Sequence, residues 1–197
     1  MERTHNILLC GVGGQGILLA SEIISSALMM AGFDVKQSAV HGMAQRGGPV
    51  ISHIRYGEKV YSPLIELGSA DITASFELLE SLRYLPYYNR DTRVIVNMQK
   101  IPPSPVSTGM DTYPPDVLDL LKSRGLTVFP FDAFDIAQSI GETRAANVLI
   151  TGALSVFLPF IDEKIFLKVI KNRIPEKIRK VNIKAFLKGR SLIRHHL

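Results

Sequence analysis

The sequence predicts an α/β protein: a three-layer α/β/α sandwich with a Rossmann-like, mostly parallel sheet and extra C-terminal helices. The first observation lies at residues 6–20, where a short apolar run meets a glycine-rich turn and a segment of helical periodicity follows. A strand, a tight turn and a helix start in this order begin a βαβ unit. The second observation is that short apolar runs and helical segments alternate through the rest of the chain, which favours a parallel or mixed sheet covered on both faces.

The individual elements follow from local patterns. We expect the first strand at residues 7–10 and the first helix at residues 14–31. Residues 50–56 alternate in polarity like a strand with one polar face, and Gly57-Glu58 predicts a hairpin turn into residues 59–61. The other predicted elements are strands at 35–39, 70–75, 93–97 and 126–131, a proline-rich connection without regular structure at 98–115, and helices at 77–84, 114–125, 132–140, 143–158, 162–173 and from 175 onward.

Length and charge suggest one domain with a basic end. The 197 residues fit a single domain with a core at about residues 5–160 and a basic helical extension at about 162–197. Residues 164–197 carry 11 Lys or Arg against one acid, a net charge of +10, whereas residues 1–163 carry 12 against 17, a net charge of −5. Such a tail can bind nucleic acid or a membrane. Because its apolar residues recur at helical spacing, we favour helices whose lysines are solvated or face a partner.

The single cysteine, Cys10, lies inside the first predicted strand. One thiol cannot hold an iron–sulfur cluster or a cysteine-based zinc site, and it cannot form an internal disulfide. The start of the sequence lacks the pattern of a signal peptide, and the apolar stretch at 148–161 is too short to span a bilayer. We therefore expect a cytoplasmic protein with no membrane partner. In that same stretch, Gly152 and neighbouring small residues predict close helix packing.

The glycine-rich turn is the first candidate site. Glycines let the backbone turn sharply, and the N–H groups at the helix start favour anionic or carbonyl oxygen. In a dinucleotide site an acid about 20 residues further on binds the ribose, but that position falls near residues 36–38, which hold no acid. A packing or protein-contact turn and a phosphate-binding turn both stay open, and an ordinary NAD site is disfavoured. The candidate residues are Gly11, Gly13, Gly14, Gln15 and Gly16.

A second candidate site is the loop that follows the second predicted strand. Residues 39–49 combine glycines with clustered hydrogen-bond donors, just beyond a strand end, where ligands bind in open α/β sheets. A surface turn with a solvated arginine is the alternative. We favour a functional loop, because such loops more often form sites than simple connections. The candidate residues are His41, Gln45, Arg46, Gly47 and Gly48.

These motifs carry a family resemblance. The chain resembles the gamma-type component of the 2-oxoacid:ferredoxin oxidoreductases, in particular the indolepyruvate-type enzymes, through about residue 160. On this resemblance residues 1–197 form one pyruvate/ketoisovalerate oxidoreductase gamma-type catalytic domain. The stretches that carry it are 11–16, 41–48 followed by 52–55, 70–71, 97–103 and 144–149.

The resemblance implies the oxidative decarboxylation of an aryl 2-oxo acid, such as indolepyruvate, with coenzyme A to aryl-acyl-CoA, carbon dioxide and reduced ferredoxin. Thiamine diphosphate with magnesium and iron–sulfur clusters would do this chemistry. Neither is expected in this chain alone, because Cys10 is its single cysteine and no Gly-Asp-Gly signature occurs. The implied partner is a larger alpha subunit that carries both cofactors in a hetero-oligomer, with ferredoxin as the electron acceptor.

For the two candidate loops the resemblance leaves two roles open. Gln15, Gln45, Arg46 and backbone N–H groups could hold a coenzyme A phosphate or the substrate carboxylate. Alternatively, both loops serve assembly only. His41 could relay a proton, but a structural histidine is an equal reading, so we assign no catalytic residue. A free-standing Rossmann-like nucleotide-binding protein is the alternative to the whole reading.

Overall fold

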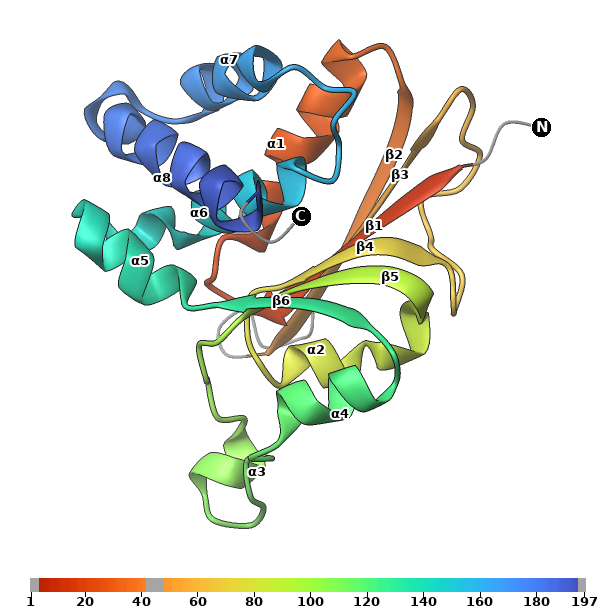
Figure 1. Ribbon diagram of the computed structural model, residues 1–197, viewed down its shortest axis with the longest axis vertical. Helices are drawn as coiled ribbons and strands as arrows, with labels where there is room; N and C mark the ends of the chain where they lie inside the picture. Colours follow the sequence, from red (N-terminus) through yellow and green to blue (C-terminus); the bar gives the residue numbers. More distant parts are fainter. Residues whose placement is uncertain (1–3, 42–47, 195–197) are drawn as a thin grey trace.

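The computed structural model describes residues 4–41 and 48–194 (Figure 1), and within them a six-stranded sheet runs in the order β2-β3-β1-β4-β5-β6. Strand β3 is antiparallel to both of its neighbours, and the β1–β4, β4–β5 and β5–β6 pairs are parallel. The predicted mostly parallel sheet is therefore confirmed. The strands are β1 (His5–Val12), β2 (Asp34–His41), β3 (Pro49–Gly57), β4 (Ala70–Ser75), β5 (Tyr88–Asn97) and β6 (Thr127–Phe131).

Helices cover both faces of the sheet, which confirms the three-layer architecture. One face carries α1 (Ile17–Met30), α5 (Ala133–Ile140), η2 (Thr143–Ala145), α6 (Ala146–Ser155), α7 (Glu163–Arg173) and α8 (Glu176–Arg194). The other face carries α2 (Glu80–Arg83), η1 (Leu85–Tyr87) and α4 (Val117–Ser123), while α3 (Ser104–Ser107) lies on a projecting arm (Figure 1).

Strand β1 lies between two hydrophobic clusters. Ile7 and Leu9 belong to the cluster under α1 and α6, whereas Leu8 belongs to the cluster under α4. Successive side chains of a strand point to opposite faces, so a central strand covered on both sides needs apolar residues at nearly every position. This requirement explains the continuous apolar run that marked the strand in the sequence.

The C-terminal helices pack into the same core as the sheet. Every residue of α6 from Asn147 to Ser155 is buried, because the sheet covers one side of the helix and α8 the other (Figure 1). A Cβ on Gly152 would lie 2.8 Å from the carbonyl carbon of Phe186, and a Cβ on Gly189 would lie 2.9 Å from that of Leu149. The close packing predicted at Gly152 is thus confirmed, and Gly189 is its counterpart on α8.

The predicted hairpin at 59–61 is wrong. Both edges of β3 are already paired, with β1 on one side and β2 on the other, so a further strand has no edge to join. The Val60 N–H instead donates to Asp34 Oδ2 at 2.9 Å. Arg55 Nη1 donates to the carbonyls of Ser62 and Leu64 at 3.1 and 3.2 Å and holds the rest of the segment as an ordered loop.

Two other expectations need correction. The connection at 98–115 contains the one-turn helix α3. Its proline does not prevent this helix, because it lies in the first turn, where the N–H that a proline lacks would have no partner. The helix expected from Thr143 starts instead as the 3₁₀ turn η2, capped by the Glu142 side chain, and α6 ends at Ser155. Across the described ranges, no helix combines the length and the apolar character needed to cross a bilayer.

Candidate functional site

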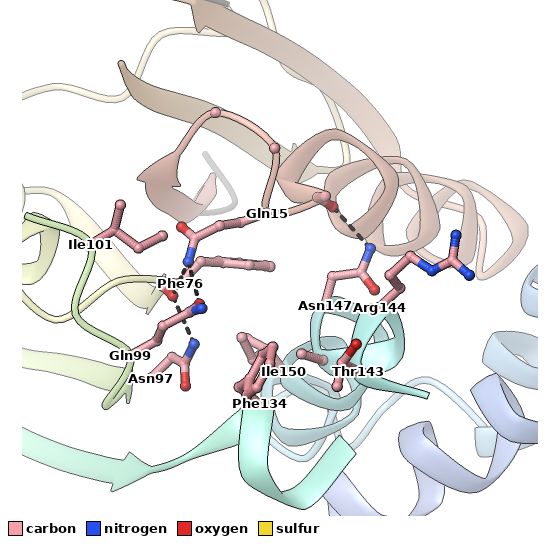
Figure 2. A pocket seen from close by; sticks show the side chains of 14 residues that line it. Gln15, Phe76, Asn97, Gln99, Ile101, Phe134, Thr143, Arg144, Asn147 and Ile150 are labelled. Atoms are coloured by element: carbon pink, nitrogen blue, oxygen red, sulfur yellow. Dashed lines mark hydrogen bonds between the residues drawn. The ribbon is translucent and has the colours of Figure 1, made fainter. Parts of the chain in front are cut away.

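A cavity of about 530 Å³ opens at the carboxyl ends of the parallel strands (Figure 2). It is lined by the turn after β1, by Phe76 after β4, by Asn97 and Gln99 at the end of β5, and by the starts of α5 and α6. The chain leaves β1 toward one face of the sheet and β4 toward the other. Ligands bind in open α/β sheets at such a switch point.

The glycine-rich turn is a closely packed wall of this cavity. Gly14 and Gly16 have φ values of 102° and 77°, a region that favours glycine. Gly11 has a different reason, because a Cβ there would lie 2.6 Å from Gln15 Oε1 and 2.8 Å from Phe76 Cβ. At Gly16 a Cβ would lie 3.0 Å from Cγ of Asn147 on α6. The spacing of the glycines therefore reflects packing as well as room for a ligand.

Gln15 ties the turn to the neighbouring strand ends. Its Oε1 accepts from the Val12 N–H at 2.8 Å, and its Nε2 donates to the Phe76 carbonyl at 2.7 Å and to Gln99 Oε1 at 2.9 Å (Figure 2). Both N–H bonds of this amide are thus used inside the protein. Gln15 holds the wall in place, and what it can still offer a ligand is a lone pair of Oε1.

Asn97 is a site residue to which the sequence prediction gave no role. Buried to 2% exposure, it donates to the Phe76 carbonyl at 2.8 Å and accepts from the Ala133 N–H at 2.9 Å. It therefore joins the end of β4 to the start of α5 and fixes Phe134 at the cavity (Figure 2). The signal in the sequence was a polar residue that closes an apolar strand.

The electrostatics of the cavity favour an anionic group. The start of α1 at Gly16 has no side-chain cap and carries the partial positive charge of a helix N-terminus. The starts of α5 and α6 also line the cavity, but Asp132 caps α5 and Glu142 caps the turn that precedes α6. Among the lining residues that the structure describes, none is acidic. Arg144 stands at the rim and hydrogen-bonds Glu142 at 3.1 Å, which lowers the pKa of that carboxyl group.

Apolar side chains line both sides of the cavity. Phe76 and Ile101 lie on the side of Gln15 and Gln99, and Phe134 and Ile150 lie on the side of α5 and α6 (Figure 2). Aromatic and aliphatic walls with a few placed polar groups are the usual make-up of a small-molecule site. The cavity therefore suits a ligand that has an anionic end and an apolar or ring-shaped body.

Glu77 supports the wall at Ile101 from behind. It is buried to 1% exposure and accepts hydrogen bonds from Tyr113 OH at 2.7 Å, from the Ile101 N–H at 2.9 Å and from the Glu80 N–H at 3.0 Å. Ile101 and Tyr113 stand at the two ends of the projecting arm that contains α3, so one buried carboxylate holds both. The sequence gave no signal for this clamp, because its members lie far apart along the chain.

Some of the predicted site residues line the cavity, and others do not. Gly13, Gly14, Gln15 and Gly16 line the cavity, and the Gly13 N–H donates to the Gly48 carbonyl at 2.9 Å, which joins the two predicted loops. Gly11 packs behind the turn. His41 ends β2, but its side chain and residues Gln45, Arg46 and Gly47 lie outside the described part of the chain.

An ordinary dinucleotide site does not fit this sheet. Strand β3 lies between β1 and β2, so the tip of β2 is two strand spacings, about 10 Å, from the glycine turn. No group of three or more His, Cys, Asp or Glu among the described residues could hold a metal ion. Cys10 is fully buried, and burial raises the pKa of its thiol to about 12, which excludes it as a nucleophile at neutral pH.

The comparisons with known proteins point in one direction. The model of the family "Pyruvate ferredoxin/flavodoxin oxidoreductase" matches residues 6–192. Indolepyruvate oxidoreductase subunit IorB of Thermococcus kodakarensis is 40% identical over 193 residues, which cover 95% of both chains.

Two solved structures share the fold. The gamma subunit of a keto/oxoacid ferredoxin oxidoreductase from Geobacter sulfurreducens is 20% identical with a TM-score of 0.73, and the match covers 97% of this chain and 99% of that one. A 2-oxoglutarate:ferredoxin oxidoreductase from Magnetococcus marinus, solved with 2-oxoglutarate, coenzyme A and succinyl-CoA bound, is 20% identical with a TM-score of 0.78. That match covers 99% of this chain and 32% of the other, so the same fold occurs there as one part of a longer polypeptide.

Proposed function

The chain belongs to the pyruvate ferredoxin/flavodoxin oxidoreductase family, and from this premise we propose that it is the smaller subunit of an indolepyruvate:ferredoxin oxidoreductase. The reaction is the coenzyme A-dependent oxidative decarboxylation of an aryl 2-oxo acid to aryl-acyl-CoA, with reduction of ferredoxin. The observation that carries the proposal is the 40% identity to an indolepyruvate oxidoreductase subunit over 95% of both chains. We further propose that residues 1–197 act as one gamma-type domain in a cytoplasmic complex.

We propose that the cofactors sit in a larger partner subunit. Cys10 is the single cysteine of the sequence and is fully buried, so it cannot ligate a cluster. The sequence holds no Gly-Asp-Gly signature of a diphosphate–magnesium site, and the described residues form no group of three or more His, Cys, Asp or Glu that could hold a metal ion. Thiamine diphosphate in the partner would supply the carbanion chemistry. This chain's own residues then bind, orient and shield a co-substrate.

The lining of the cavity supports that binding role. The uncapped start of α1 suits a phosphate of coenzyme A or the carboxylate of the 2-oxo acid, and Phe76 and Phe134 suit a ring or an alkyl chain. The proposed site comprises Gly11, Gly13, Gly14, Gln15, Gly16, His41, Gln45, Arg46, Gly47 and Gly48, together with Asn97 and Phe134. Gly48 supports including the second loop, since its carbonyl accepts the Gly13 N–H.

The function is tested by co-expression with the large, cysteine-rich subunit from the same source. We expect the purified pair to reduce ferredoxin with indolepyruvate and coenzyme A, and neither subunit to do so alone. An isolated chain that oxidises the 2-oxo acid, or that holds stoichiometric iron, would contradict the division of labour. A purified pair that is inactive with every aryl 2-oxo acid would contradict the proposed activity.

The role of the second loop has its own test. In the complex, Arg46→Ala should raise the Michaelis constant for coenzyme A or for indolepyruvate. Arg90→Ala is the matched control, because Arg90 is exposed near the start of β5, whereas the cavity lies at the other end of that strand, at Asn97. Equal Michaelis constants in all three proteins would restrict the loop to assembly.

A further inference from the structure

Helices α7 and α8 both expose lysines to solvent, and we call these residues together the lysine face. On α8 the lysines follow one another at spacings of three and four residues, so they form a single row along the helix. At 1.5 Å per residue this row is about 16 Å long. The lysine face comprises Lys177, Lys180, Lys184 and Lys188 on α8 and Lys164, Lys168 and Lys171 on α7.

The arginines of these helices have a different role. Arg190 is buried, lies 2.9 Å from Glu163 Oε2 and donates to Ser155 Oγ at 2.7 Å. Arg173 pairs with Glu22 on α1. By contrast, no ion pair joins any lysine of the lysine face to another described residue. The arginines therefore fix the helices, and the charge of the lysines is left uncompensated.

The platform beneath the lysine face is rigid. Helix α8 crosses α6 at Gly152 and Gly189 with no room for a side chain, and the rings of Phe166 and Phe186 meet at 5.4 Å between α7 and α8. A partner would meet a surface that is already arranged, so binding would cost little ordering of the backbone.

The composition of the lysine face identifies the kind of partner. A permanent subunit interface is apolar at its centre and poor in lysine, whereas Ala185, Phe186 and Ile193 of α8 are buried in the protein's own core. An uncompensated cationic face is suited to fast, charge-steered and reversible encounter with an acidic protein.

Nucleic acid and membrane fit this face less well. Both aromatic residues of 163–194, all of which the structure describes, are buried, so no ring is available to stack on a base. A helix that lies on a membrane exposes an apolar face, but Leu187, 39% exposed, is the one large apolar side chain exposed on α7 or α8.

We propose that the lysine face docks the acidic electron-carrier protein, of the ferredoxin or flavodoxin type, that the complex reduces. The inference rests on the proposed function, in which this carrier is the macromolecular substrate that must bind and leave in every turnover. A reversible, salt-sensitive surface meets that requirement.

The test uses the two-subunit complex with two acceptors. Lys180→Glu/Lys184→Glu reverses the charge at the middle of the α8 row. Lys59→Glu/Lys122→Glu, the control, makes the same net-charge change at two exposed positions elsewhere. We expect the Michaelis constant for ferredoxin to rise about tenfold or more in the first variant and to stay near wild type in the second. Reduction of methyl viologen, a small cation that needs no protein docking, should be unchanged in both.

The outcomes separate the two proposals. A wild-type complex that reduces neither acceptor refutes the proposed function itself. A complex that reduces methyl viologen normally but shows the same ferredoxin Michaelis constant in all variants overturns the docking inference. Lys177→Glu/Lys188→Glu repeats the test at the ends of the row if the first variant assembles poorly. Tighter binding of a short DNA duplex, or of phosphatidylserine vesicles, than of ferredoxin would also overturn it.

Discussion

From the close crossing of α6 and α8 we predict that Gly189→Ala destabilises the protein. At an open helical position, Gly→Ala stabilises a protein by up to about 1 kcal/mol. At Gly189 the new Cβ would lie 2.9 Å from both the Ala153 nitrogen and the Leu149 carbonyl carbon, and a real Cβ does not approach backbone atoms so closely. Because the obstacle is the backbone of α6, no side-chain rotation relieves it.

The helices must therefore move apart, and the core beneath them must loosen. Phe166, Phe186 and Ile193 belong to that core and are buried to 1% exposure or less. Overpacking of this kind costs about 1–3 kcal/mol, and sometimes more, which exceeds the gain in helix propensity. We expect Gly189→Ala to lower the free energy of unfolding by about 2 kcal/mol and the Tm by about 4–8 °C.

The assay is urea and thermal unfolding followed by circular dichroism. Lys188→Ala is the matched control, because Lys188 directly precedes Gly189 in the same helix and is exposed. Its effect should stay within about 0.5 kcal/mol. Gly152→Ala should behave like Gly189→Ala, since it meets the Phe186 backbone at the same crossing. If Gly189→Ala were as stable as wild type, the close approach of the two helices would be refuted.

Three further predictions concern buried polar groups. Asn97→Ala should destabilise the protein by about 1–3 kcal/mol, because it leaves the buried Ala133 N–H without its partner and the Phe76 carbonyl with Gln15 alone. It should also raise the Michaelis constant for the co-substrate of the complex; unfolding and steady-state kinetics measure the two effects. Burial raises the pKa of Glu80 above its usual 4.5, so the folded protein favours the protonated carboxyl group. The stability of wild type relative to Glu80→Gln should therefore fall as pH rises from 4.5 toward neutrality. A stability difference that does not depend on pH would contradict this. Cys10, fully buried with its pKa raised to about 12, should react with a thiol reagent only after unfolding, and rapid labelling of the native chain would show that it is accessible.

Local patterns in the sequence were sufficient for most of the elements and the order of the layers. The start of α7, which Asp162 caps, and the glycine turn after β1 could be predicted from sequence because each depends on residues within a few positions of one another. The prediction of a hairpin at 59–61 was wrong for a non-local reason, because β2 pairs with the outer edge of β3. A turn signal such as Gly57-Glu58 carries no information about which edge of a strand is free.

The same distinction explains what was missed at the site. Gly11 and Gly16 could be located from their spacing, but part of the reason for each lies far away in the chain, at Phe76 for Gly11 and at Asn147 for Gly16. The Glu77 clamp joins Ile101 to Tyr113 across the projecting arm. Interactions between residues this far apart leave no periodic trace, so one sequence cannot reveal them.

The glycine turn shows how one local motif can serve two architectures. In a dinucleotide site the turn works together with an acid on the tip of the adjacent parallel strand. Here the antiparallel strand β3 occupies that neighbouring position, and the Gly13 N–H is used to hold the loop end at Gly48. What remains for a ligand is the start of α1 together with the starts of α5 and α6. No acid stands among the described lining residues of the cavity, so it offers no carboxylate that would recognise a ribose. The uncapped start of α1 and the apolar rings suit a ligand with an anionic end. The motif alone would suggest NAD, whereas its setting in the sheet favours an anionic co-substrate.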